Sequence, residues 1–133
     1  MKLSLSENKV NQLILVDAEE DQTLSSDFNL NFEPVFLEEN PRQFKILFDF
    51  EYITADKKYL RVDFHSYFVT DSDIDDGFRT SKFPVVNAPA IAFPFLRAFL
   101  ANLLISSGHQ PILLPSINFQ NFAQENIPKP VAL

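Results

Sequence analysis

The sequence has 133 residues, 46% of them hydrophobic, and a formal net charge of −7 at pH 7. A chain of this length builds one domain around a single core, so residues 1–133 are treated as one unit. The acidic balance argues against partners rich in phosphate, both nucleic acids and anionic membranes. The absence of cysteine excludes disulfide and thiolate chemistry. The first residues lack the form of a signal peptide, and we expect a soluble cytoplasmic protein without membrane insertion.

The first predicted strand covers residues 10–17, where apolar side chains occupy both faces in the middle of the run. An acidic stretch completes it with Asp17, Glu19, Glu20 and Asp21. Two interpretations of these acids stay open. They either form a solvated edge that deters pairing with other sheets, or they form a docking patch for a basic partner.

Three further strands are predicted from the alternation of apolar and polar residues. The second covers residues 28–33, and Pro34 either ends its pairing or places it at an edge of the sheet. The third and fourth cover residues 44–52 and 60–68 and form a hairpin around the polar turn 55–58. The sheet then has one apolar and one charged face, and we expect a helix to cover the apolar face.

The segment 70–86, between the fourth strand and the helix, begins with an aspartate-rich run that resembles a calcium-binding loop. That motif requires Gly at loop position six and Glu at position twelve. Counted from Asp71, these positions hold Asp76 and Lys82. We therefore expect a solvated loop here.

The helix that follows has no polar face, since residues 95–105 read FLRAFLANLLI. A helix that is apolar all round is buried on more than one side, and this one is too short to span a bilayer. We expect one side to pack on its own sheet and the other on a second subunit. The residues predicted for this oligomer interface are Phe95, Phe99, Leu100 and Leu103.

The ends of the helix are predicted from its capping residues. Asn87 is expected to cap the start and Gly108 to stop the helix. Pro94 lacks an N–H and should break it, giving a first turn at 88–93 and a main helix at 94–107.

The loop after Gly108 carries four apolar residues between prolines, a composition too apolar for an ordinary exposed connection. Something must cover this loop. Asn118 is then predicted to cap a short helix at 119–126.

No nucleophile beside a base, carboxylate pair or set of metal ligands stands out, so we expect neither an enzyme nor a metal or cofactor. His65 lies on the polar face of a strand, and the helix dipole alone favours His109 at a helix C-terminus. A site made of both histidines stays open, although no third ligand is suggested. Arg97 is expected to pair with a buried carboxylate.

Short motifs in the helix and loop resemble those of the SecB export-chaperone family. They are Asn87-Ala88-Pro89, Phe93-Pro94-Phe95 with Arg97, Gly108, and Leu114-Pro115-Ser116-Ile117-Asn118-Phe119, in the order and spacing of that family. Two positions depart from the pattern. Ala98 replaces a frequent Glu, and Ser116 replaces the second Pro of the loop.

The resemblance implies an α+β fold, with a four-stranded antiparallel sheet and a long and a short C-terminal helix packed on one side. It implies a chaperone, a dimer of dimers, that holds non-native polypeptides in hydrophobic grooves and keeps preproteins export-competent for the Sec pathway. The groove residues it indicates are Phe32, Phe36, Leu113, Ile117 and Phe119. Asp17, Glu20 and Asp21 would then dock the SecA motor.

Three other hypotheses stay open. A related branch of the family holds an antitoxin in place of preproteins. The curved sheet and helix would also suit a protein that binds a small apolar ligand in a pocket. The last hypothesis is a structural oligomer that has no client.

Overall fold

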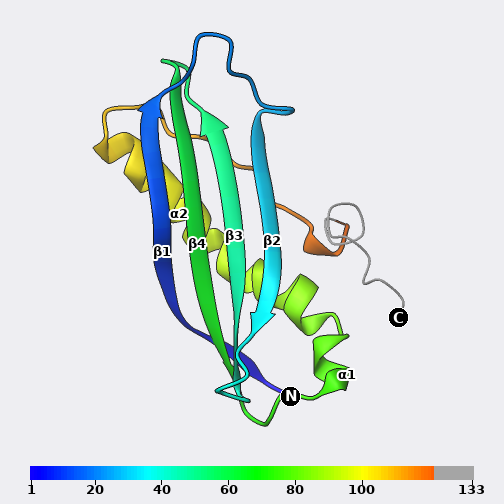
Figure 1. Ribbon diagram of the computed structural model, residues 1–133. Coiled ribbons are helices and arrows are strands. Elements are labelled where there is room, and N and C mark those ends of the chain that lie inside the picture. The colour runs from blue at the N-terminus through cyan, green and yellow to red at the C-terminus, as the bar shows by residue number, and fades with distance from the viewer. Residues whose placement is uncertain (122–133) are drawn as a thin grey trace.

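The computed structural model describes residues 1–121 and shows an antiparallel sheet covered on one face by a long helix (Figure 1). The strands lie in the order β1-β4-β3-β2. Their bounds are Leu3–Asp17 for β1, Phe28–Phe36 for β2, Gln43–Ile53 for β3 and Lys58–Thr70 for β4. The helical elements are α1 at Asp76–Arg79, a π-helical turn η1 at Phe83–Asn87, and α2 at Ala88–Ser106. The expected α+β fold is confirmed.

The two faces of the sheet differ as the alternation predicts. On the inner face, which faces α2, β3 and β4 place apolar side chains opposite each other, as in the pairs Phe44–Phe68 and Phe48–Phe64. These four rings are buried. The outer face carries the charged residues of both strands. The predicted hairpin is confirmed, and it provides the centre of the core.

Strand β1 begins at Leu3, earlier than the predicted start at residue 10. Two bulges explain why the sequence pattern missed its first half, since the register with β4 shifts between Leu5 and Glu7 and again between Val10 and Gln12. Each bulge adds one residue and so exchanges odd for even positions on the inner face. Leu5, Val10 and Leu13 therefore all face inward, although their numbers do not keep one parity.

Strand β2 is an edge strand, one of the two outcomes that Pro34 allowed. Pro34 pairs with Ile46 of β3, and pairing continues to Phe36, so the strand extends beyond the proline. A proline is tolerated here because a residue whose N–H points away from the sheet gives up no ladder hydrogen bond.

Helix α2 is continuous from Ala88, and Pro94 does not break it, contrary to the prediction. Pro94 lies on the exposed side of the helix, where water can satisfy the carbonyl that loses its partner. Asn87 does not cap the helix, because η1 precedes it and gives it helical angles of φ −69° and ψ −48°. Gly108 adopts φ +85° after the last turn, as expected for a helix stop.

One side of α2 is buried and the other is open. The buried residues recur every three or four positions and are Ala88, Pro89, Ala92, Phe93, Leu96, Leu100 and Leu104. Ile91, Phe95 and Ile105 point away from the sheet and are exposed. The helix thus lacks a polar face, as the sequence indicates, while the chain itself covers only one of its sides.

The segment 70–86 is more ordered than the solvated loop that the sequence predicts. Ile74 and Phe78 are buried in the core. The Asp75 carboxylate caps α1 by accepting a hydrogen bond from the Phe78 backbone N–H at 2.7 Å. The aspartate run therefore serves helix capping here, and the two apolar residues within it are the signal that the sequence reading passed over.

Candidate functional site

The interhelix loop, residues 109–118, crosses behind the sheet from the side of β1 to the side of β2 (Figure 1). Ile112, Leu114 and Ile117 pack against the core. Leu113 lies between two of these anchors and is 92% exposed. The chain therefore covers most of this apolar loop, as its composition requires, but leaves one large apolar side chain in solvent.

The end of the loop is fixed by a cluster of aromatic rings. Phe119 meets Phe32 of β2 at a ring-centroid distance of 5.4 Å and Phe93 of α2 at 5.6 Å, both edge to face. Phe119 and Phe32 are buried. The Asn118 carboxamide oxygen accepts a hydrogen bond from the Gln120 N–H at 3.0 Å, as expected of a helix cap. The rest of the helix predicted at 119–126 lies outside the described residues.

The residues that the resemblance indicates for the groove take different positions. Leu113 is open to solvent, and Ile117 is half-buried beside it in the sequence. Phe32 and Phe119 are buried and belong to the core. Phe36 lies farther along β2, half-buried, where its ring packs at a tilt against Phe44 with centroids 5.7 Å apart. The Arg79 guanidinium lies over the Phe36 ring at 5.6 Å, so Leu113 is the most open apolar side chain among these residues.

The four residues predicted for the oligomer interface divide between the two sides of α2. Phe95 is 52% exposed, whereas Phe99 and Leu103 are half-buried at the boundary. Phe99 packs against Phe64 of β4 with ring centroids 5.8 Å apart. Leu100 has no exposed surface because it faces the chain's own sheet, so it is not available to another subunit.

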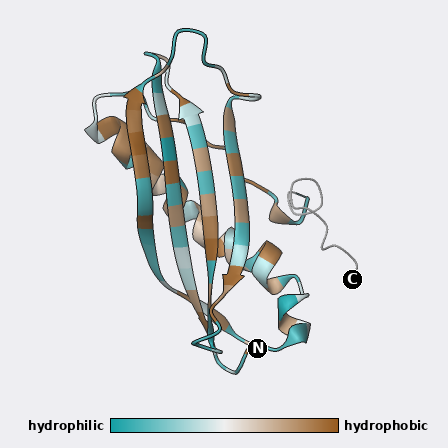
Figure 2. Cartoon of the chain, in the orientation of Figure 1, coloured by the Kyte–Doolittle hydropathy of each residue, from teal (hydrophilic) through white to brown (hydrophobic). Residues whose placement is uncertain are grey.

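Other exposed apolar residues were not identified from the sequence. Ile91 and Ile105 extend the open side of α2, and Val10 and Leu13 are partly exposed on the inner face of β1. Figure 2 shows how apolar residues fill the C-terminal half of β1. The helical period of α2 could have indicated that Ile91 and Ile105 face away from the sheet. The bulges of β1 break the alternation that would have placed Val10 and Leu13 on the inner face.

The predicted docking acids lie at the end of β1 and in the connection after it. Glu20 and Asp21 are exposed. The Asp17 carboxylate forms an ion pair with the Lys58 ammonium of β4, which raises the pKa of that lysine through a hydrogen bond and charge attraction. Two of the three acids thus remain free to meet a partner, and the third is partly neutralised.

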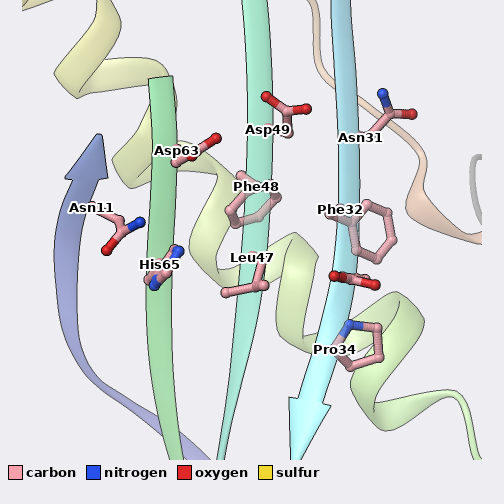
Figure 3. Close-up of a pocket in the computed structure, with 10 residues that line it drawn as sticks. Asn11, Asn31, Phe32, Pro34, Leu47, Phe48, Asp49, Asp63 and His65 are labelled. Carbon is pink, nitrogen blue, oxygen red and sulfur yellow. The ribbon is translucent and has the colours of Figure 1, made fainter. Parts of the chain in front are cut away.

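A hollow of about 900 Å³, which the sequence did not predict, lies on the sheet (Figure 3). It is lined by Asn11, Asn31, Phe32, Glu33, Pro34, Leu47, Phe48, Asp49, Asp63 and His65. Most of these side chains belong to the outer face, and Phe32 is the one residue shared with the predicted groove. The hollow forms because pairing between strands brings together polar residues that are distant in the sequence, and a single sequence does not reveal this pairing.

The charges in this hollow are only partly balanced. Asp49 and Asp63 lie opposite each other on β3 and β4. Burial raises the pKa of Asp49 above its usual value, Arg61 opposes this rise, and Asp63 and Glu51 add to it. The Asp49 Oδ1 and Arg61 Nε atoms are buried without a hydrogen bond in residues 1–121, but they face each other at 3.4 Å as an ion pair.

The other polar residues singled out from the sequence are the two histidines and Arg97. Burial, followed by the charge of Lys45, lowers the pKa of His65. His109 contacts Asp56, described below. The described residues contain no group of three potential metal ligands. Within residues 1–121 Arg97 forms no ion pair, contrary to the prediction, and its guanidinium lies over the Phe93 ring at 6.0 Å.

The expectation that the helix is too short to span a bilayer rests on residues 95–105, but the whole helical segment Phe83–Ser106 is long and apolar enough to cross a membrane by length and composition alone. Its buried side, however, packs against the sheet, as the core helix of a soluble domain does.

Two solved structures resemble this fold. The Mycobacterium tuberculosis SecB-like chaperone Rv1957, in complex with a ChAD peptide from the Rv1956 HigA1 antitoxin, superimposes with a TM-score of 0.64 at 11% identity, covering 86% of this chain and 90% of that chain. A protein of unknown function from Streptococcus agalactiae gives a TM-score of 0.52 at 15% identity, covering 86% of this chain and 98% of that chain. At such identities these similarities establish the fold alone.

No curated protein matches the sequence. A sequence model of the family described as "Preprotein translocase subunit SecB" matches residues 27–129, most of the chain. The match includes the strands β2 to β4, helix α2 and the interhelix loop with its motifs. The chain belongs to the SecB family.

Proposed function

We propose that this protein is a cytoplasmic chaperone that holds non-native polypeptides on the apolar surface beside the interhelix loop. The observation that carries the proposal is Leu113, which is 92% exposed although its neighbours Ile112 and Leu114 are anchored in the core. The anchors hold this side chain outward. Apolar groups that a soluble protein keeps in solvent in this way mark binding surfaces when they lie beside other apolar groups.

The binding surface of the proposal consists of Leu113, Ile117 and Phe36, together with the buried Phe32 and Phe119. These side chains carry no charge and no hydrogen-bonding group, so they select clients by apolar area and not by sequence. Burial of apolar surface contributes about 25 cal/mol per Å². A chaperone needs this kind of recognition because non-native chains share exposed apolar residues and little else.

We propose preproteins bound for the Sec pathway as the clients. The description of the matching family, a preprotein translocase subunit, supports this choice. An antitoxin is the second candidate, favoured by the antitoxin peptide in complex with Rv1957. The two candidates are distinguished by titrating the protein with an unfolded preprotein and with an antitoxin peptide.

We propose further that the working form is a homo-oligomer, a dimer of dimers, assembled through the open side of α2. Phe95, Ile91 and Ile105 leave a large apolar area in solvent that a second copy would cover. Asp17, Glu20 and Asp21 lie elsewhere, at one end of β1. They are proposed to dock the SecA motor through charge.

The test combines solution mass with the aggregation of a chemically unfolded client, followed by light scattering. We expect a mass of several chains and suppression of aggregation at near-equal concentrations of chaperone and client. Client binding should show a negative change in heat capacity, because apolar surface is buried, and little dependence on salt. A monomer that leaves aggregation unchanged would refute the proposed function.

A further inference from the structure

The interhelix loop begins with a contact between two titratable side chains that no role described so far uses. The His109 Nδ1 atom lies 2.8 Å from the Asp56 Oδ2 atom, and the His109 side chain is only 11% exposed. His109 is the first residue of the loop, and its backbone N–H donates to the Leu104 carbonyl at 2.8 Å. Asp56 belongs to the turn between β3 and β4. The contact therefore ties the loop to the tip of the central hairpin.

The hairpin tip is itself held firmly. The Thr54 hydroxyl donates to Asp56 Oδ1 at 2.6 Å and accepts from the Lys58 N–H at 2.9 Å. The Ala18 N–H donates to the Lys57 carbonyl at 2.9 Å, which joins the end of β1 to the same turn. The Thr54 hydroxyl and, to a lesser degree, His109 lower the pKa of the Asp56 carboxyl. His109 thus meets a carboxylate that other bonds already orient.

The loop has few other polar ties. In the described chain, residues 110–117 form no hydrogen bond, and Asn118 makes the next polar contact at the far end. Between these ends the loop is held only by the apolar contacts of Ile112, Leu114 and Ile117. Such contacts are not directional, so the path of the loop depends strongly on its two polar ends.

We propose that the contact between His109 and Asp56 positions the interhelix loop and so sets how long a polypeptide stays on the surface around Leu113. This inference rests on the proposed function for its effect on clients. A loop that is fixed at its start holds Leu113 in one arrangement. A client then binds without the entropic cost of ordering the loop. Loss of the contact adds that ordering cost to binding, which shortens the lifetime of the complex.

The experiment uses His109→Ala, Asp56→Ala and the double variant in the full chain. Hydrogen exchange of residues 110–117 reports the loop directly, and the dissociation rate of an unfolded client reports the surface. We expect faster exchange in the loop and a client release about two- to fivefold faster in each single variant, the range for a partly exposed ion pair. Since both residues act through one contact, the double variant should be no worse than the worse single variant.

Two further variants separate positioning from a general loss of structure. Asp56→Asn keeps an oxygen that can accept a hydrogen bond from His109. Its client dissociation rate should therefore be close to that of the wild-type protein. His65→Ala removes the other histidine, on the outer face, and should change neither the exchange of the loop nor client release. Exchange in α2 serves as the internal reference for folding in all variants.

The outcomes decide the two proposals separately. Unchanged exchange at residues 110–117 in both single variants would overturn the positioning role. The same holds if the effects of the two single variants add up in the double variant. If wild-type protein binds no unfolded client, the proposed function fails, while the exchange measurement still tests whether the contact holds the loop.

Discussion

The pKa of the Asp49 carboxyl depends on its burial and on the charges around it on the outer face. It is paired with Asp63 across the two central strands, with Arg61 on one side as the opposing charge. The raised pKa of Asp49 means that the folded protein favours its neutral form. The stability that this shift contributes is complete below the unfolded pKa and is lost as pH rises through the folded pKa.

Asp49→Asn should therefore stabilise the protein at pH 7, because the amide avoids the cost of burying a charge and also the repulsion from Asp63 and Glu51. The expected gain in free energy of unfolding is about 0.5 kcal/mol, since solvent screens charges at a half-exposed site. The gain should shrink as pH falls toward the usual aspartate pKa of 3.8 and vanish below it. Urea denaturation of both proteins at several pH values measures this difference. Asp27→Asn, in an exposed connection, serves as control, and an equal gain there would disprove the local cause.

Leu113→Asp should weaken client holding without affecting the fold. Its side chain is 92% exposed, so the carboxylate stays hydrated and the thermal midpoint should change little. Client affinity should fall severalfold because a charge replaces apolar surface at the contact. Val16→Asp places the same change at an exposed apolar residue of β1 on the outer face and should leave client binding intact. Equal loss in both variants would show that Leu113 has no special part.

At the scale of elements, helix α2 has one side packed on the sheet and one side open to solvent, although its sequence is apolar on both. The sequence indicates burial on every side but does not say which residues face the sheet and which face outward. Leu100 and Phe95 both lie in the apolar run, yet the first has no exposed surface and the second is 52% exposed.

Substitutions at these two positions should therefore have different effects, one on the stability of the chain and the other on its assembly. Leu100→Ala should cost about 2–5 kcal/mol of the free energy of unfolding, since it opens a cavity in the core. Phe95→Glu should leave each chain folded but lower the solution mass, because assembly would bury an unpaired carboxylate. Circular dichroism and light scattering measure the two effects. A Phe95→Glu protein of unchanged mass would remove the open side of α2 from the interface.

The sequence predicts the sheet better than it predicts the site. Alternation fixes β3 and β4 because each buries one whole face, and the motifs of the loop identify the family. The first half of β1 was missed because two bulges break the alternation, and Pro94 was misread because its exposure depends on how α2 lies on the sheet. The hollow around Asp49 and the contact of His109 with Asp56 join residues distant in sequence, which local patterns do not reveal.

At the scale of the whole molecule, the proposed functions occupy separate regions. Clients are assigned to the surface around the interhelix loop, subunit contacts to the open side of α2, and motor docking to the acidic end of β1. Changes in one region should therefore leave the other two intact.

The combined change of Asp17→Asn, Glu20→Gln and Asp21→Asn tests this separation. Fold, mass and client holding should persist, because exposed charges contribute little to stability. Association with the basic tail of the motor should weaken, and association of the wild-type protein should weaken as salt rises. A binding titration at two ionic strengths measures both. Equal affinity of the two proteins would return these acids to the role of a solvated edge.

The bulges of β1 and the proline of β2 have a consequence for a protein that works among unfolded chains. Both strands at the borders of the sheet have one edge that no other strand within residues 1–121 pairs with, and an extended client would otherwise add itself there as another strand. The shifts after Leu5 and Val10 interrupt one border, and Pro34 removes a donor from the other. Neither border offers a continuous template for strand addition. If the protein holds aggregation-prone chains as proposed, it would therefore bind them by their side chains and would not become the seed on which they assemble.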